Sequence, residues 1–67
     1  MTIEQQIEAD WMLVHVIEVA DADLNVAQED YLDRARRTLE RDRPLSIELR
    51  HELQLIRLAL PELVAND

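Results

Sequence analysis

The chain has 67 residues and a formal net charge of −8, with no cysteine, no glycine and two prolines, Pro44 and Pro61. This length predicts one domain over residues 1–67, and the lack of cysteine excludes disulfides and thiolate metal sites. Tight turns between strands need glycine-type residues, so the composition favours an all-α fold. The negative charge argues against direct binding to nucleic acid or to an anionic membrane.

The charge is divided unevenly along the chain. Residues 1–33 contain nine acidic residues and no arginine or lysine, whereas residues 34–67 contain seven arginines and six acidic residues. Four of the arginines lie between positions 34 and 41. The acidity therefore belongs to the N-terminal half.

A first helix is predicted over residues 3–20. Thr2 and Gln5 have the spacing of a capping box, in which each side chain accepts a hydrogen bond from a backbone N–H group of the first turn. Helical periodicity gives this segment two apolar stripes. One stripe comprises Ile3, Ile7, Trp11 and Val14, and the other comprises Leu13, Val16, Ile17 and Ala20.

A second helix is predicted over residues 26–41, with Asn25 or Asp23 as its N-cap. A single apolar face carries Leu24, Tyr31, Leu32, Ala35 and Leu39. On the opposite, charged face, Asp30–Arg34 and Asp33–Arg37 are i,i+4 pairs with the acid first, which is the favourable order. This helix is predicted to be one-sided and solvated on its outer face.

A third helix is predicted over residues 46–60, with Ser46 as N-cap, followed by a short turn over 61–65 because Pro61 should end or kink the helix. One apolar stripe has the spacing of a core or coiled-coil seam: Leu49, Leu53, Ile56, Leu60 and Leu63. A second stripe lies on roughly the opposite side: Ile47, His51, Leu55 and Leu58. One core covers only one of these stripes.

The surplus apolar surface predicts that the three-helix domain assembles as a helical homodimer. Two alternatives stay open, namely that the short helices wrap around one another and cover both stripes, or that a different protein covers the second stripe. The residues predicted at the dimer interface are Trp11, Val14, Ile47, His51, Leu55 and Leu58.

No residue pattern indicates catalysis, a cofactor or a metal site. Asp21, Asp23 and Asn25 match the first ligands of a calcium loop, but Val26 and Leu32 stand where its glycine and bidentate glutamate belong. The two histidines, His15 and His51, have neither the spacing of a zinc site nor a partner nucleophile, since the only serine is the predicted cap. The chain is therefore predicted not to be an enzyme.

The remaining chemistry is that of a surface. Arginine offers carboxylates a planar, bidentate fork and stacks on aromatic rings, and tyrosine is favoured in protein interfaces. The predicted partner-binding residues are Glu29, Asp30, Tyr31, Asp33, Arg34, Arg37 and Arg41.

These features predict a small, acidic, cytoplasmic regulator or inhibitor that acts by contact with another protein. The alternative is a mimic of nucleic acid, whose carboxylates occupy the basic groove of a DNA- or RNA-binding protein. A DNA-reading helix-turn-helix is disfavoured by the acidic neighbours of the clustered arginines.

Overall fold

Three α-helices form in residues 1–64, the part of the chain that the computed structural model describes: α1 (Ile3–Val19), α2 (Val26–Glu40) and α3 (Ile47–Leu63). No strand occurs in this part, so the predicted all-α, three-helix fold is confirmed. The predicted boundaries agree with the observed ones within one residue, except at the end of α3.

Each helix begins at a polar side chain that caps its first turn. The Gln5 N–H donates to Thr2 Oγ1 at 3.2 Å and the Thr2 N–H donates to Gln5 Oε1 at 2.9 Å, which completes the predicted capping box. Asn25 and Gln28 form the same reciprocal pair at α2, so Asn25 is the cap and Asp23 is not. Ser46 accepts from the Leu49 N–H at 3.1 Å at the start of α3.

Aspartates take the place of glycine where α1 and α2 end. Asp21 and Asp42 have φ values of 50° and 58°, in the left-handed region that glycine usually occupies after a helix. The Asp42 N–H donates to the Leu39 carbonyl and the Arg43 N–H donates to the Thr38 carbonyl, which is the Schellman arrangement. Aspartate tolerates this backbone better than most residues, so a chain without glycine still turns sharply.

The prediction that the third helix ends near residue 60 was wrong, because α3 continues past Pro61 to Leu63 with Val64 as its C-cap. Pro61 lies in the last turn, where its missing N–H removes one hydrogen bond and leaves the rest of the helix intact. The first three residues of the predicted turn 61–65 are thus helical, and residue 65 lies outside the described residues. The Asp23 N–H donates to the Leu63 carbonyl at 3.1 Å, which ties the α1–α2 loop to the end of α3.

The core takes residues from every helix and from the α2–α3 loop. In α1 the buried residues come from both predicted stripes, because the face that meets α2 and α3 lies between them. On α3 only the first stripe is turned inward. The buried hydrophobic residues are Leu13, Val14 and Ile17 of α1, Leu32, Ala35 and Leu39 of α2, Leu45 of the loop, and Leu53 and Ile56 of α3.

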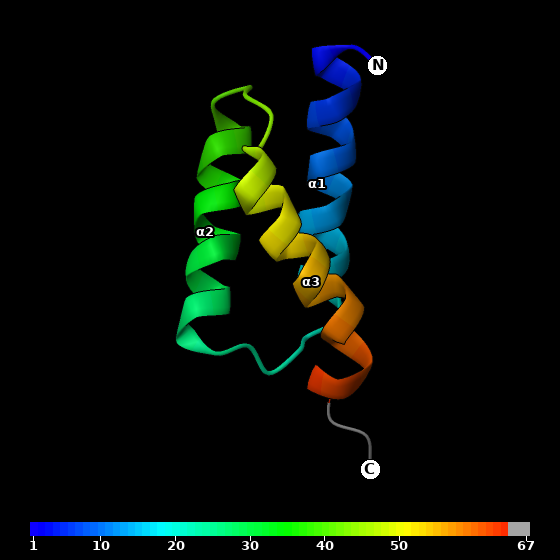
Figure 1. Cartoon of the computed structure of the whole chain (residues 1–67), viewed down its shortest axis with the longest axis vertical. Coiled ribbons are helices and arrows are strands. Elements are labelled where there is room, and N and C mark those ends of the chain that lie inside the picture. The colour runs from blue at the N-terminus through cyan, green and yellow to red at the C-terminus, as the bar shows by residue number, and fades with distance from the viewer. Residues whose placement is uncertain (65–67) are drawn as a thin grey trace.

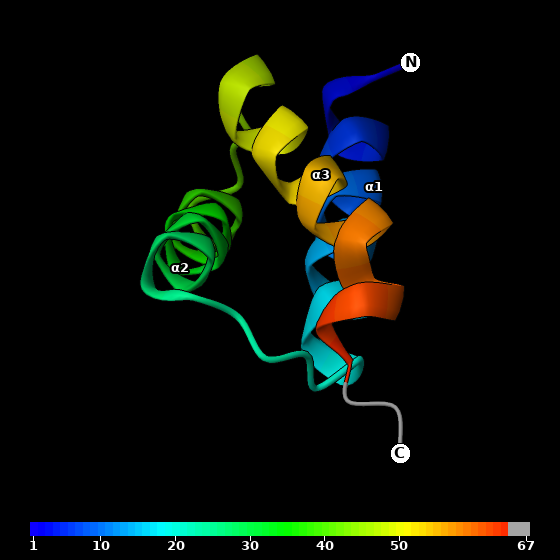
Figure 2. The ribbon, with the colours of Figure 1, turned by 60° about the horizontal axis from the view of Figure 1, so that its bottom comes forward.

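All three helices contact one another, and α3 runs obliquely across the other two (Figures 1 and 2). Its N-terminal half starts beside the C-terminal end of α2, and its C-terminal half descends toward the C-terminal end of α1 (Figure 1). Within residues 1–64, no helix combines the length and apolarity that a membrane crossing requires.

Candidate interaction surface

The second apolar stripe of α3 remains at the surface of the chain. We call Ile47, His51, Leu55 and Leu58 the outer stripe. Ile47 is 82% exposed, Leu55 47% and Leu58 78%, and His51 is also exposed. Helical periodicity puts these residues opposite Leu53 and Ile56, which face the core. Wrapping of the three helices therefore does not cover the outer stripe in a single chain.

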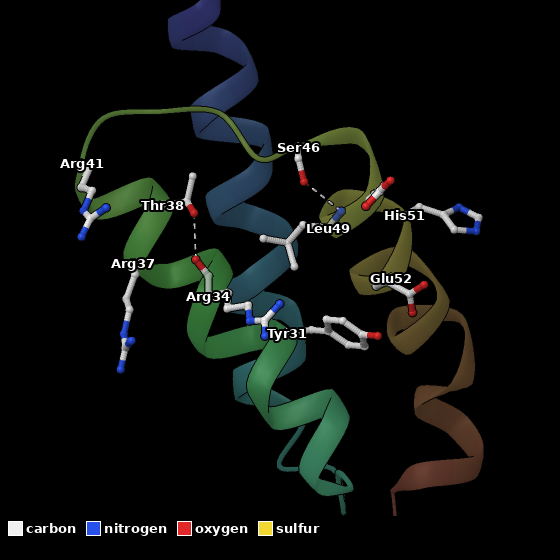
Figure 3. Close-up of a pocket in the computed structure, with 10 residues that line it drawn as sticks. Tyr31, Arg34, Arg37, Thr38, Arg41, Ser46, Leu49, His51 and Glu52 are labelled. Atoms are coloured by element: carbon white, nitrogen blue, oxygen red, sulfur yellow. Dashed lines mark hydrogen bonds between the residues drawn. The ribbon is translucent and has the colours of Figure 1, made fainter.

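A groove of about 650 Å³ lies next to the outer stripe, between α2 and the N-terminal half of α3. We call it the α2–α3 groove. Tyr31 extends from α2 toward α3, and Leu49 lies between the two helices (Figure 3). Both side chains are half-buried and pack against the core, so they give the groove an apolar floor.

The two walls of the α2–α3 groove carry opposite charges. The α2 wall presents Arg34, Arg37 and Arg41, while the α3 wall presents Glu48 and Glu52. Thr38 and Ser46 also line the groove, but their hydroxyl groups already have partners on their own helices. The Thr38 hydroxyl donates to the Arg34 carbonyl, and the Ser46 hydroxyl accepts from the Leu49 N–H (Figure 3). The groove therefore suits an occupant with an apolar centre and charged margins.

The arginines of the α2 wall are not equivalent. Arg34 pairs with Asp30 at 2.9 Å and Arg37 pairs with Asp33 at 3.0 Å, as the i,i+4 spacing predicted. Arg41 has no ion pair within residues 1–64, and its side chain points away from the body of the molecule in Figure 3. Exposed pairs of this kind contribute well under about 1 kcal/mol to stability, so the arginines are available to another partner.

The structure divides the predicted partner-binding residues into two sets. Tyr31, Arg34, Arg37 and Arg41 line the α2–α3 groove. Glu29, Asp30 and Asp33 do not line it; Asp30 and Asp33 hold two of the groove arginines, and Glu29 is exposed in the first turn of α2. His51, predicted at the dimer interface, also borders the groove, so the two predicted surfaces are continuous.

The predicted dimer-interface residues are divided as well. Ile47, His51, Leu55 and Leu58 share the outer side of α3. Val14 is 0% exposed and belongs to the core, so its side chain is not available for a contact between copies. Trp11 is 36% exposed but lies on α1, outside the outer stripe and outside the groove. Periodicity alone grouped Val14 with Trp11 because it does not show which side of α1 faces the other helices.

Sequence reasoning missed a buried polar network centred on Asp10. Asp10 is 1% exposed, and its carboxylate accepts hydrogen bonds from Arg50 Nε at 2.8 Å and Arg50 Nη2 at 3.1 Å. It also accepts from the Leu45 N–H at 3.0 Å and from Gln6 Nε2 at 2.9 Å. Arg50 Nη2 donates further to the Leu45 carbonyl at 2.9 Å. The network joins α1, the α2–α3 loop and α3.

The surroundings of Asp10 shift both pKa values of the pair. Burial alone raises the pKa of Asp10, but hydrogen bonds from Arg50, Leu45 and Gln6, with the positive charge of Arg50, outweigh burial and hold that pKa below its usual value. The hydrogen bond to Asp10 raises the pKa of Arg50 despite desolvation. Asp10 is therefore a structural anion and not a proton donor at neutral pH.

One feature of the sequence could have shown that Asp10 is buried. Asp10 precedes Leu13, Val14 and Ile17 by three, four and seven residues, which is the spacing of one helix face. An acidic residue in register with core residues needs a partner. Nothing local identifies that partner as Arg50, which is 40 positions away.

The residues of the incomplete calcium motif have other roles. Asp21 takes the left-handed backbone after α1, and Asn25 caps α2. No group of three or more histidine, cysteine or acidic side chains within residues 1–64 is placed to hold a metal ion.

No family model, no curated protein and no solved structure matches the chain.

Proposed function

We propose that this chain is a small protein-binding regulator or inhibitor that self-associates as a homodimer and acts by contact, without catalysis. The observation that supports it best is the exposed outer stripe. Fully burying one leucine or isoleucine side chain stabilises by about 1.5–3 kcal/mol, so covering Ile47, Leu55 and Leu58 is a substantial driving force for association. Contiguous exposed apolar surface of this kind marks interaction sites.

The charged outer side of α2 is the proposed surface for a different protein. It combines Asp30, Asp33 and Glu29 with the arginines of the α2 wall, and its ion pairs are weak enough to exchange for contacts with a partner. Such a mixed surface favours a partner with complementary charges of both signs. Charge complementarity of this type gives specificity and fast association more than affinity.

The alternative function, a mimic of nucleic acid, is less well supported, because several of the acidic side chains it would need are already paired with arginine. Of the nine acidic residues before position 34, four pair with arginine within residues 1–64: Asp10, Glu18, Asp30 and Asp33. Glu4 and Glu8, near the start of α1, border a hollow with Asp42, but the apolar side chains of Ile3 and Ile7 also line it and interrupt the anionic face. A surface that imitates a row of phosphates needs exposed, unpaired carboxylates.

Affinity capture with matched variants tests the proposal. Tagged parent protein is cross-linked in its own cells, and the captured proteins are compared with those of Arg37→Glu on α2 and Arg57→Glu on α3. Arg57 is exposed, lies outside the groove and has no ion pair within residues 1–64. We expect a partner that the parent and Arg57→Glu retain and that Arg37→Glu loses.

Two results would contradict the proposal. One is capture of no protein by the parent together with a monomeric state at all concentrations. The other is turnover of a small molecule by the purified chain. If the captured complex dissociates steeply with salt and contains a nucleic-acid-binding protein, the mimic replaces the regulator, because many exposed charge pairs are screened by salt.

A further inference from the structure

Both walls of the α2–α3 groove present charges that have no partner within residues 1–64. Arg41, at the end of the α2 wall, forms no ion pair there, and neither do Glu48 and Glu52 of the α3 wall. Glu52 is half-buried, so its carboxylate is partly shielded from water without a compensating cation. The two walls therefore favour an occupant that is acidic on the side facing α2 and basic on the side facing α3.

The floor of the groove adds an apolar anchor with one free polar group. Tyr31 and Leu49 pack against the core with one side and line the groove with the other. The Tyr31 ring extends toward α3 (Figure 3), and its hydroxyl forms no hydrogen bond within residues 1–64. A tyrosine placed in this way buries apolar surface against a partner while its hydroxyl bonds to it.

The backbone of the groove walls determines what shape of peptide fits. Between their ends, α2 and α3 use their N–H and carbonyl groups in their own hydrogen bonds. No strand edge occurs in the part of the chain that the structure describes, so a partner cannot bind by adding a strand. A bound segment must therefore satisfy its own backbone groups, and an α-helix does so.

We propose that the α2–α3 groove binds an amphipathic α-helix of a different protein, with its apolar face on the floor, its acidic flank against the arginines of the α2 wall and its basic flank against the glutamates of the α3 wall. This inference rests on the proposed function and specifies the partner's chemistry. The α2 wall extends over residues 34–41, about 10 Å along a helix axis, so the contact covers about two turns of the bound helix. Turning that helix end for end brings like charges together, so the walls also set its direction.

Selection from a library of displayed helices tests the chemistry of the occupant. Every member carries the same leucine stripe, and the positions flanking the stripe on both sides vary among aspartate, lysine and alanine. The immobilised parent protein is expected to select helices with aspartate on one flank and lysine on the other. Selection of the same charge on both flanks, or of no helix at all, would overturn the inference.

Titration calorimetry of the most enriched helix against matched variants tests the α2 wall. Arg41→Glu should raise the Kd at least about tenfold, because it puts a carboxylate opposite the acidic flank. Arg43→Glu is the control: it makes the same charge change outside the groove, at a residue with no ion pair within residues 1–64. The control should bind like the parent. Equal losses in the two variants would mean that the helix responds to net charge alone and would contradict binding in the groove.

NMR of the parent protein locates the selected helix. Tyr31 is the only tyrosine of the chain, so its ring signals are unambiguous and should shift on binding. Shifts confined to Leu55 and Leu58 would place the helix on the outer stripe and refute the inference. A nitroxide at one end of the helix should broaden signals at one end of the groove, and broadening at both ends would contradict the single direction.

Failure of this inference is distinguishable from failure of the proposed function. If no helix is selected but affinity capture still returns a partner that Arg37→Glu loses, the proposed function stands and the helix in the groove is wrong. If the selected helix dissociates self-associated parent protein in sedimentation velocity, the groove belongs to a second copy, which also overturns the inference. Circular dichroism of each variant excludes loss of the fold as the cause.

Discussion

At the scale of single residues, Asp10 is the buried charge on which three segments converge. Its carboxylate accepts four hydrogen bonds from Gln6, Leu45 and Arg50. A buried ion pair loses hydration, so its presence alone does not make a fold more stable than an apolar pair would. Removing one partner, however, leaves the other charge without compensation. The pair therefore fixes how the α2–α3 loop sits against α1.

Asp10→Ala is expected to lower the free energy of unfolding by about 3 kcal/mol, because Arg50 and the Leu45 N–H lose their acceptor. Urea denaturation followed by circular dichroism measures this change. The matched control is Asp33→Ala, which breaks the exposed pair with Arg37 and should cost less than about 1 kcal/mol. Equal effects of the two substitutions would show that the Asp10 network is no stronger than a surface pair.

The lowered pKa of Asp10 makes stability depend on pH in acid. In the unfolded chain this carboxyl binds a proton near its ordinary pKa of 3.8, whereas in the folded chain it stays ionised to lower pH. Its contribution to stability is therefore fully present above that value and is lost as pH falls through the folded pKa. In urea titrations from pH 6 to pH 2, Asp10→Asn should show a shallower loss of stability than the parent. Parallel curves would refute the assignment.

At the scale of elements, the helix ends depend on aspartates in a backbone region that glycine prefers. Asp42→Gly should stabilise the fold by about 1 kcal/mol. The left-handed backbone costs a residue with a side chain roughly 1–2 kcal/mol, and glycine avoids this cost. Part of the gain is lost because the unfolded chain has more conformational entropy with glycine at this position. Thermal melting measures the shift. Asp42→Ala is the control and should destabilise, because alanine tolerates positive φ less well than aspartate does.

At the scale of the whole molecule, a chain this small buries too little surface to be more than marginally stable alone. If the outer stripe is covered by a second copy, association adds to the stability by mass action. The Tm of the parent should therefore rise as protein concentration increases from micromolar to millimolar. The Tm of Leu58→Glu should be independent of concentration, and scanning calorimetry over that range distinguishes the two behaviours.

The sequence by itself determined the parts that depend on neighbours along the chain. Helix caps and i,i+4 ion pairs involve residues three or four positions apart, and periodicity shows that one core cannot cover both stripes of α3. The structure confirms the Thr2, Asn25 and Ser46 caps and the exposure of Ile47 and Leu58.

Only the tertiary structure decided which side of each helix meets the others. In the folded chain Val14 is buried, whereas Trp11 stays partly exposed. Asp10 pairs with Arg50, and α2 and α3 together form a groove. These outcomes depend on the relative rotation and crossing of helices, which long-range packing sets. A one-dimensional pattern shows that a face is apolar or charged, and it does not show what that face will touch.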